Sequence, residues 1–334
     1  MAQDDLVAVT NRIFPETRDR LQQAARLEAN GSDAPWPAPR LRAALAEATG
    51  LMAFMTDRVD AELLAAAPRL KVIGAALKGH DNIDLEAATR AGVWVTIVPD
   101  LLTAPTAELA IGLMLALGRH ILEGDRGIRA HGFAGWRPQL YGCGLQDMNV
   151  GIVGYGLVGR AIASRLHGFG CHLMAHDLQA AAGRPAGLPG EPVTFRALPE
   201  LLSMSDYVVL ALPLTDRTRH VIDAGALAQM KPGARLVNPA RGSLVDEAAV
   251  ADALERGRLA GYAADVFACE DWAQADRPHG IDPRLTAPGA PTVLTPHIGS
   301  ATVAARRSIE LAAAESILDA LAGRVPRCAV NDPR

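Results

Sequence analysis

The sequence predicts an α/β protein made of two units, each with a parallel β-sheet covered by helices. Short runs of β-branched and aliphatic residues alternate with longer amphipathic segments rich in alanine and leucine, and this alternation is typical of β–α–β units. The runs fall into two series, on either side of a long helical pattern at residues 105–119. A chain of 334 residues, with 49% hydrophobic and 21% charged residues, is also long enough to bury two cores.

The first series predicts four strands, at Leu6–Val9, Leu51–Met55, Lys71–Leu77 and Val93–Val98, with helices at Asp60–Ala67 and Leu85–Ala91. The second predicts strands at Val150–Val153, His172–Ala175, Tyr207–Leu212, Arg235–Asn238, Gly261–Val266 and Val293–Thr295. The helix Pro105–Arg119 should bridge the two units. The amphipathic segment Ala301–Ala322, which no strand follows, should return to the first unit. Residues 35–39 and 180–192 are expected to be irregular connections.

Composition limits the class of partner. A net charge of −4 and a pI near 6.1 give no electrostatic reason to expect a nucleic acid. The longest apolar stretch is too short to span a bilayer, and the first residues do not resemble an export signal. Four scattered cysteines without C-x-x-C spacing fit a reducing cytoplasm better than a disulfide or zinc framework. We therefore expect a cytoplasmic protein that binds a small molecule, with no metal, nucleic acid or membrane partner.

A glycine motif points to a dinucleotide. Gly154, Gly156 and Gly159 form G-x-G-x-x-G between an apolar strand and an amphipathic helix. These glycines allow a tight turn, close approach of the backbone to a pyrophosphate, and close packing of helix on strand. Asp177 ends the next strand, where a carboxylate can bind the ribose hydroxyls and would repel a 2′-phosphate. The pattern predicts a Rossmann-type domain that binds NAD rather than NADP; the alternative is a structural glycine turn.

Charged residues follow three later strands of the same unit. Arg241 lies in LVNPARGSLVDE, Asp265 and Glu270 in YAADVFACED, and His297 in TPHIGS. The carboxyl ends of parallel strands are where such sheets bind ligands, so these groups can converge beside the cofactor. Arginine can bind an oxyanion, and a histidine oriented by a carboxylate can exchange a proton. The alternatives are a structural ion pair between Arg241 and Glu270 and an ordinary loop histidine.

Several of these stretches resemble the NAD-dependent D-2-hydroxyacid dehydrogenase family, over nearly the whole chain. The similarity lies in GHDNIDLEAA, TAELAIGLMLALGR, VGIVGYGLVGR, LVNPARGSLVDEAAV and TPHIGS. It implies a Rossmann NAD-binding domain, residues 101–299, inserted into a discontinuous flavodoxin-like substrate domain, residues 1–100 and 300–334, with the active site in the cleft and a homodimer as the assembly. It also implies cofactor contacts from a further set of residues, namely Thr106, Leu157, Val158, Leu212, Pro213, Pro239, Ala240, Asp265 and His297.

Within that family the chain is most similar to the phosphite-oxidising members, in MAFMTDRVDAELL, VIGAALKGHDNID, GWRPQLYGCGL and YAADVFACEDWAQADRP. Lys78 stands where other members have a small or aliphatic residue. Since phosphite is largely a dianion near neutral pH, two cations, Lys78 and Arg241, would balance its charge. The alternative for Lys78 is a lysine that extends from a strand end into solvent.

The resemblance extends the predicted substrate site to Gly79, Met55, Trp136, Tyr141 and Arg306. For Met55 the alternative is ordinary core packing, and for Trp136 and Tyr141 it is packing at a domain or subunit interface. The dipeptide Arg306-Arg307 leaves open which arginine supports the site.

The predicted reaction is oxidation of phosphite to phosphate by NAD, with Lys78, Arg241 and the backbone near Gly79 binding the anion. His297, oriented by Glu270, would take a proton from the attacking water. One alternative is a D-2-hydroxyacid dehydrogenase or glyoxylate/hydroxypyruvate reductase, which shares Arg241, Glu270 and His297. Another is a nucleotide-sensing corepressor that binds peptides, since one fold serves many functions.

Overall fold

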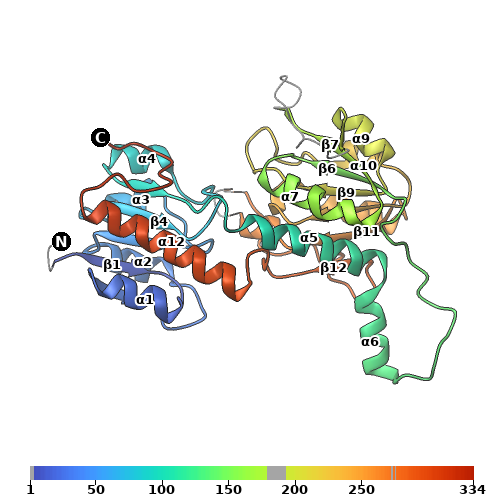
Figure 1. The fold of residues 1–334 in the computed structure, drawn as a ribbon, viewed down its shortest axis with the longest axis horizontal. Helices are drawn as coiled ribbons and strands as arrows, with labels where there is room; N and C mark the ends of the chain where they lie inside the picture. The colour runs from blue at the N-terminus through green and yellow to red at the C-terminus, as the bar shows by residue number, and fades with distance from the viewer. Residues whose placement is uncertain (1–3, 179–192, 272–273, 275) are drawn as a thin grey trace. The chain divides into compact units, whose positions relative to one another are not determined.

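The computed structural model describes residues 4–178, 193–271, 274 and 276–334. Its internal contacts divide the chain into two compact units. Unit 1 comprises residues 1–102, 272–275 and 300–334, and unit 2 comprises residues 103–271 and 276–299. Each unit has its own parallel sheet, which confirms the expected α/β fold class (Figure 1).

The sheet of unit 1 has the strand order β2-β1-β3-β4-β5, and every neighbouring pair is parallel. Its strands are β1 (Leu6–Val9), β2 (Arg26–Ala29), β3 (Gly50–Ala53), β4 (Val72–Ala75) and β5 (Trp94–Thr96). The helices are α1 (Pro15–Gln22), α2 (Ala38–Leu45), α3 (Ala61–Ala65), α4 (Leu85–Arg90) and α12 (Val303–Leu321). This parallel order places the carboxyl ends of β1, β3 and β4 at one edge of the sheet.

The long helix α12 packs on the sheet of unit 1, which confirms the expected return of the C-terminal segment (Figure 1). Its Ile317 side chain fills the space above Gly74, where an added Cβ would lie only 2.5 Å from Cγ1 of Ile317. Glycine is therefore required on β4 at this close helix–sheet contact.

The sheet of unit 2 has the order β12-β11-β10-β9-β6-β7-β8, again with every neighbouring pair parallel. Its strands are β6 (Asn149–Val153), β7 (His172–His176), β8 (Val193–Phe195), β9 (Tyr207–Leu210), β10 (Ala234–Asn238), β11 (Leu259–Ala264) and β12 (Thr292–Leu294). The strand order reverses between β6 and β9, and ligands of doubly wound sheets bind at such a reversal.

The described residues of unit 2 form the helices α5 (Thr103–Gly118), α6 (Ile121–His131), α7 (Leu157–Leu166), α9 (Leu198–Met204), α10 (Ala224–Gln229) and α11 (Glu247–Glu255). Short 3₁₀ turns accompany them at η1 (His167–Phe169), η2 (Gly242–Leu244) and η3 (Ala268–Glu270). Helix α6 extends away from the sheet of its unit and buries none of its residues (Figure 1).

Some predicted strands end earlier than expected. The expected strand Leu51–Met55 stops at Ala53, because the Phe54 N–H turns to the Asp57 carboxylate instead of a neighbouring strand. Likewise β4 stops at Ala75, so Leu77 and Lys78 belong to the loop that follows. The expected connection 180–192 lies outside the described residues.

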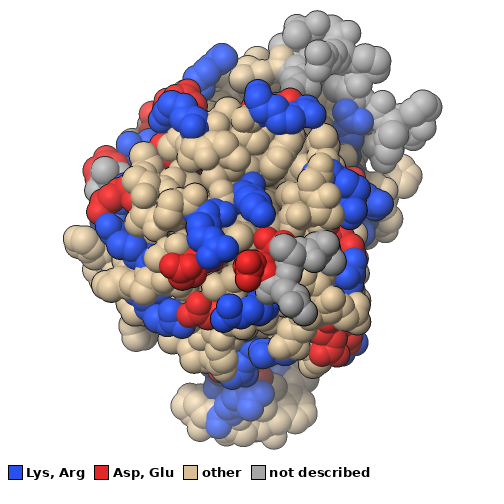
Figure 2. All heavy atoms as spheres, turned by 90° about the vertical axis from the view of Figure 1, so that its left-hand side faces the viewer, with Lys and Arg blue, Asp and Glu red and all other residues tan. Residues whose placement is uncertain are grey.

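Acidic and basic side chains are interspersed on the face of unit 1 that Figure 2 shows. Unit 1 also has ion pairs between neighbouring elements, for example Arg42 with Glu62 at 2.6 Å and Arg69 with Glu47 at 3.0 Å. Within the described residues, no helix combines the length and the apolar character needed to cross a lipid bilayer.

Candidate active site

Unit 2 brings His297 and Glu270 together. The Nδ1 atom of His297 lies 2.8 Å from Oε2 of Glu270, and the other carboxylate oxygen, Oε1, accepts the Phe267 N–H at 3.1 Å. Because an ionised carboxylate only accepts hydrogen bonds, the proton of a neutral imidazole lies on Nδ1. This tautomer leaves Nε2 of His297 as the basic atom.

Asp265 holds the loop that carries His297. Its carboxylate accepts the Thr295 hydroxyl at 2.6 Å and the backbone N–H groups of Ile298 at 2.8 Å and Gly299 at 2.7 Å. The backbone of His297 adopts φ = 54°, and its N–H donates to the Asp265 carbonyl at 2.8 Å. A left-handed backbone is uncommon for histidine because it costs conformational energy, and these hydrogen bonds offset that cost. Burial raises the pKa of Asp265 above its ordinary value, and its hydrogen bonds and the nearby His297 offset only part of this rise.

Arg241 follows β10 in a loop held by the buried side chain of Asn238. Asn238 Nδ2 donates to the Arg241 carbonyl at 2.8 Å, and Asn238 Oδ1 accepts the Ala240 N–H at 3.1 Å. The Arg241 guanidinium is partly buried, and its Nη1 donates to the Ala240 carbonyl at 2.8 Å. The structure thus places Arg241, Glu270 and His297 after β10, β11 and β12, three neighbouring strands.

The predicted glycine motif lies between β6 and α7, at the reversal of strand order. Gly154 has φ = +95°, and an added Cβ would lie 2.5 Å from the Ala211 carbonyl oxygen. Among the described residues, an added Cβ at Gly156, the residue before α7, would meet nothing within 4 Å, and no side chain caps the helix. The open space and the free first N–H groups of α7 fit the pyrophosphate of a dinucleotide.

Asp177 follows β7, the strand beside β6. One carboxylate oxygen, Oδ2, accepts the Tyr155 N–H of the glycine loop at 2.7 Å. Asp177 therefore both orders this loop and holds an acidic group next to it, which fits the adenosine ribose of the cofactor.

The other predicted cofactor residues of unit 2 lie at the same strand ends. Leu157 and Val158 begin α7, and Leu212 and Pro213 follow β9. Pro239 and Ala240 follow β10, while Thr106 lies on α5 against Gly299. Pro239 is buried, so of that pair Ala240 is the more accessible.

Unit 1 places Lys78 in the loop after β4, together with Gly79. Lys78 is partly buried, and among the described residues it makes no hydrogen bond and no ion pair. Burial lowers the pKa of its ammonium, and the negative charge of Asp100 opposes this. A partly desolvated cation without a bonded partner is suited to bind an anion.

Met55 and Arg306 lie near the neighbouring strand ends of unit 1. Met55 packs against the apolar cluster of that unit. Arg306 is partly buried, its Nη1 donates to the Ala76 carbonyl at 3.4 Å, and its guanidinium lies 5.7 Å from the centre of the Phe54 ring. Arg307 instead pairs with Glu16 at 3.4 Å. Of the two arginines, Arg306 therefore faces the ends of β3 and β4.

Trp136 and Tyr141 lie on the segment that follows α6, and each is 77% exposed. Among the described residues, no hydrogen bond joins either side chain to His297, Glu270 or Arg241. That these two side chains line or cover the substrate site stays a prediction.

Two supporting sets were missed by sequence reasoning. In unit 1, the Asp57 carboxylate accepts the Thr10 hydroxyl at 2.5 Å, and Asn82 Nδ2 donates to the Asp57 carbonyl at 2.6 Å. In unit 2, Glu247 accepts the Ala268 N–H at 2.8 Å and Asp271 accepts the Ser243 N–H at 2.6 Å. No motif marks either set in the sequence, because a polar residue does not reveal which group it will bond to in the fold.

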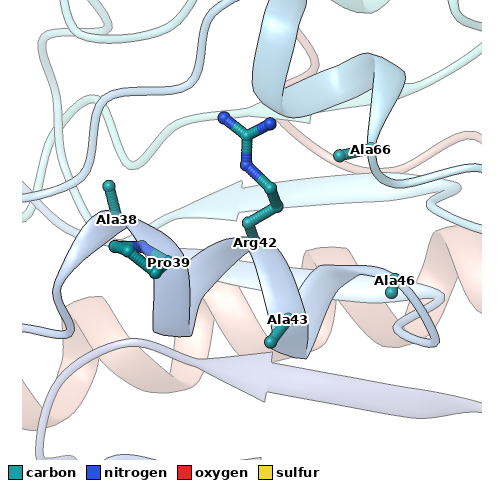
Figure 3. A pocket seen from close by; sticks show the side chains of 6 residues that line it. All are labelled: Ala38, Pro39, Arg42, Ala43, Ala46 and Ala66. Atoms are coloured by element: carbon teal, nitrogen blue, oxygen red, sulfur yellow. The ribbon is translucent and has the colours of Figure 1, made fainter.

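A surface pocket lies elsewhere on unit 1, lined by Ala38, Pro39, Arg42, Ala43, Ala46 and Ala66 (Figure 3). Apart from Arg42, which pairs with Glu62, the lining is alanine and proline. It contains none of the predicted site residues and offers no group for proton transfer.

Comparison with known proteins identifies the family. Residues 111–299 match the model described as "D-isomer specific 2-hydroxyacid dehydrogenase, NAD binding domain". A glyoxylate reductase of Pyrococcus furiosus is 35% identical over 97% of this chain and 95% of its own length, and one of Thermococcus onnurineus is 39% identical over 84% and 82%. The crystal structure of the TT0316 protein of Thermus thermophilus superposes with a TM-score of 0.87 and 36% identity, covering 98% of this chain and 100% of the other. The chain therefore belongs to the D-isomer specific 2-hydroxyacid dehydrogenase family, as an oxidoreductase with an NAD-binding domain.

Proposed function

We propose that this enzyme oxidises or reduces a small anionic substrate, with His297 as the proton-transfer group and Arg241 as an anion ligand. The observation that carries the proposal is the His297–Glu270 hydrogen bond, in the unit that also holds the dinucleotide motif. When bound, NAD supplies the hydride acceptor or donor. Glu270 keeps the His297 proton on Nδ1, so that Nε2 faces the reaction as the base or, when protonated, the acid.

We propose phosphite as the substrate, and Lys78 is the residue that supports it. In this reaction the P–H bond breaks with loss of hydride, a water oxygen forms the new P–O bond, and His297 takes a water proton. A dianionic substrate is better matched by two cationic ligands, Lys78 and Arg241, than by one. A partly buried ammonium with no ion pair among the described residues is available for this role.

Reduction of glyoxylate or a related 2-oxoacid is the second candidate, and the similarity to glyoxylate reductases over most of the chain favours it. In that direction protonated His297 would give its proton to the carbonyl oxygen while Arg241 binds the carboxylate. Lys78 would then carry a positive charge that a monoanion does not need.

We propose NAD as the cofactor and a homodimer as the assembly. Asp177, which follows β7 beside the glycine loop, supports the cofactor because its carboxylate would repel the 2′-phosphate of NADP. Phe133, Trp136 and Tyr141, exposed on the segment after α6, support the dimer because a second copy would cover them.

Following the absorbance of NADH over time, at a fixed enzyme concentration, tests which substrate the enzyme uses. The purified chain is assayed with NAD and phosphite, with NAD and D-lactate or D-glycerate, and with NADH and glyoxylate. NADH formation with phosphite alone supports the main proposal. Turnover with hydroxyacids and glyoxylate but not phosphite overturns it in favour of the second candidate. Absence of turnover with all of them overturns both.

A further inference from the structure

The turn that carries Glu270 does not hold its own position. It is a single 3₁₀ turn, η3, closed by the Glu270 N–H to the Phe267 carbonyl at 3.1 Å and the Asp271 N–H to the Ala268 carbonyl at 3.2 Å. An isolated turn of this length has little stability, because few hydrogen bonds offset its conformational entropy. Contacts from outside the turn must therefore hold Glu270 in line with His297.

Glu247 supplies such a contact. It lies in the first turn of α11 and is only 8% exposed, and its Oε1 accepts the Ala268 N–H at 2.8 Å. Helix α11 packs against β11, so the carboxylate is fixed relative to the sheet. Glu247 thus ties the start of η3 to the body of unit 2.

The same turn is packed against the loop of Arg241. At Gly242 an added Cβ would lie 1.9 Å from the Phe267 carbonyl carbon and 2.1 Å from the Ala268 nitrogen, so the two backbones touch. The Ser243 N–H donates to Asp271 Oδ2 at 2.6 Å across the same contact. A shift of η3 would therefore displace both Glu270 and the Arg241 loop.

We propose that Glu247 is a positioning residue for the reaction: through Ala268 it holds η3 so that Glu270 meets His297 Nδ1 in line with the Arg241 loop. Glu247 itself touches neither substrate nor cofactor in this proposal. The inference rests on the proposed function only in that His297 and Glu270 transfer the proton.

The chain offers a matched control in the preceding residue. Asp246 caps the same helix, accepting the N–H groups of Ala248 and Ala249 at 3.1 Å, and has no hydrogen bond to η3 among the described residues. Asp246→Ala should destabilise α11 as Glu247→Ala does, without releasing η3. Glu247→Gln keeps an oxygen that can accept the Ala268 N–H, whereas Glu247→Asp keeps the charge but withdraws the oxygen by one methylene group.

The first test is steady-state kinetics with phosphite or glyoxylate, whichever the wild-type enzyme turns over. A misplacement of about 1 Å can cost up to about 100-fold in rate, so we expect Glu247→Ala and Glu247→Asp to lower kcat by about 10-fold or more. Glu247→Gln should have a kcat within about 2-fold of the wild-type value. Asp246→Ala should lower the melting temperature but leave kcat unchanged. If Glu247→Ala does not fold, the comparison of kcat between Glu247→Asp and Glu247→Gln tests the proposal. Equal kcat in these two variants, or a kcat of Glu247→Ala no lower than that of Asp246→Ala, overturns the proposal.

The second test needs no turnover. In proton NMR of histidine-labelled enzyme, the Nδ1 proton of His297 bonded to Glu270 should give a downfield resonance, identified by its loss in His297→Asn. The resonance should broaden or vanish in Glu247→Asp and persist in Glu247→Gln and Asp246→Ala. Its persistence in Glu247→Asp would refute the positioning role. If instead His297→Asn and Glu270→Gln both keep full kcat, the proposed function fails, while the resonance still decides the role of Glu247.

Discussion

His297 Nδ1 lies 2.8 Å from Oε2 of Glu270, although the two residues are 27 positions apart in the sequence. The loop of His297 is tied to Asp265, and the turn of Glu270 is tied to Glu247 and to the loop of Arg241. The His297–Glu270 pair, for which we propose proton transfer, is therefore held from both sides by hydrogen bonds to buried carboxylates. Such preorganisation favours the reaction because little reorientation is needed when charge develops.

We predict that His297→Asn and Glu270→Gln each lower kcat by at least about 100-fold, because general acid–base catalysis contributes about that much or more. Glu270→Gln acts by removing the charge that holds the imidazole proton on Nδ1. KM should change much less than kcat in both variants. His279→Asn, at an exposed histidine of the same unit, is the control and should keep full kcat. Full activity of His297→Asn would exclude its role in proton transfer.

Lys78→Met should raise KM for phosphite by at least about 10-fold, because it removes a charge-assisted contact to a dianion while keeping much of the side-chain volume. For glyoxylate, a monoanion, KM should rise by no more than about 3-fold. Lys71→Met is the matched control, since the Lys71 ammonium lies 3.3 Å from the Asp5 carboxylate and carries no proposed ligand role. Initial rates over a range of substrate concentrations measure both. A KM for phosphite that Lys78→Met leaves unchanged would remove the main support for phosphite as the substrate.

Asp177→Ser should increase kcat/KM with NADP and decrease it with NAD, because the carboxylate that would repel the 2′-phosphate is gone. Asp177→Asn separates charge from loop support, since an amide oxygen can still accept the Tyr155 N–H. It should gain activity with NADP while losing less with NAD than Asp177→Ser does. Cofactor titrations of both variants measure this. A wild-type enzyme that uses NADP as well as NAD would contradict the assignment.

Ionisation of the buried Asp57 carboxyl group should lower the stability of unit 1 as the pH rises from about 4 to about 6. Burial raises the pKa of Asp57 from its ordinary 3.8 to about 6, with the hydrogen bonds from Thr10 and Phe54 opposing it. The folded state then binds more protons than the unfolded state in this range. The stabilisation that comes from protonated Asp57 is therefore complete below pH 3.8 and is lost as the pH rises through 6. The shift corresponds to on the order of 3 kcal/mol.

Urea unfolding at a series of pH values measures this effect in the wild type and in Asp57→Asn, with the exposed Asp33→Asn as the control. The fall in stability between pH 4 and pH 6 should be smaller in Asp57→Asn than in the other two proteins. The same fall in all three would show that Asp57 does not titrate in this range.

Trp136→Ser combined with Tyr141→Ser should weaken a homodimer, because each wild-type side chain is 77% exposed in a single chain and apolar area of this kind favours association. Light scattering after size exclusion should give twice the 35.2 kDa of one chain for the wild type and a lower mass for the double variant. Val325→Ser, at another exposed apolar residue, is the control and should remain dimeric. A monomeric wild type would refute the proposed assembly.

The strands that sequence reasoning missed have a common physical feature. Both β2 and β8 lie at an edge of their sheet, and neither buries any of its residues fully. An edge strand lacks the apolar run that marks a strand covered on both faces, so its sequence is not distinctive. Helix α6 was missed for a similar reason, since none of its residues is buried. Central strands such as β9, in which every residue is buried, were found.

The sequence by itself determined the parallel α/β class and the dinucleotide motif at Gly154, and it predicted site residues after the strand ends. These features are short-range, because hydrophobic periodicity and glycine spacing act within about twenty residues. Only the tertiary structure decided that Glu270 bonds to His297, that Arg306 rather than Arg307 faces β3 and β4, and that Glu247 holds the η3 turn. Those pairings depend on which loops the sheet order brings together, and a buried carboxylate in a sequence carries no sign of the N–H group that will satisfy it.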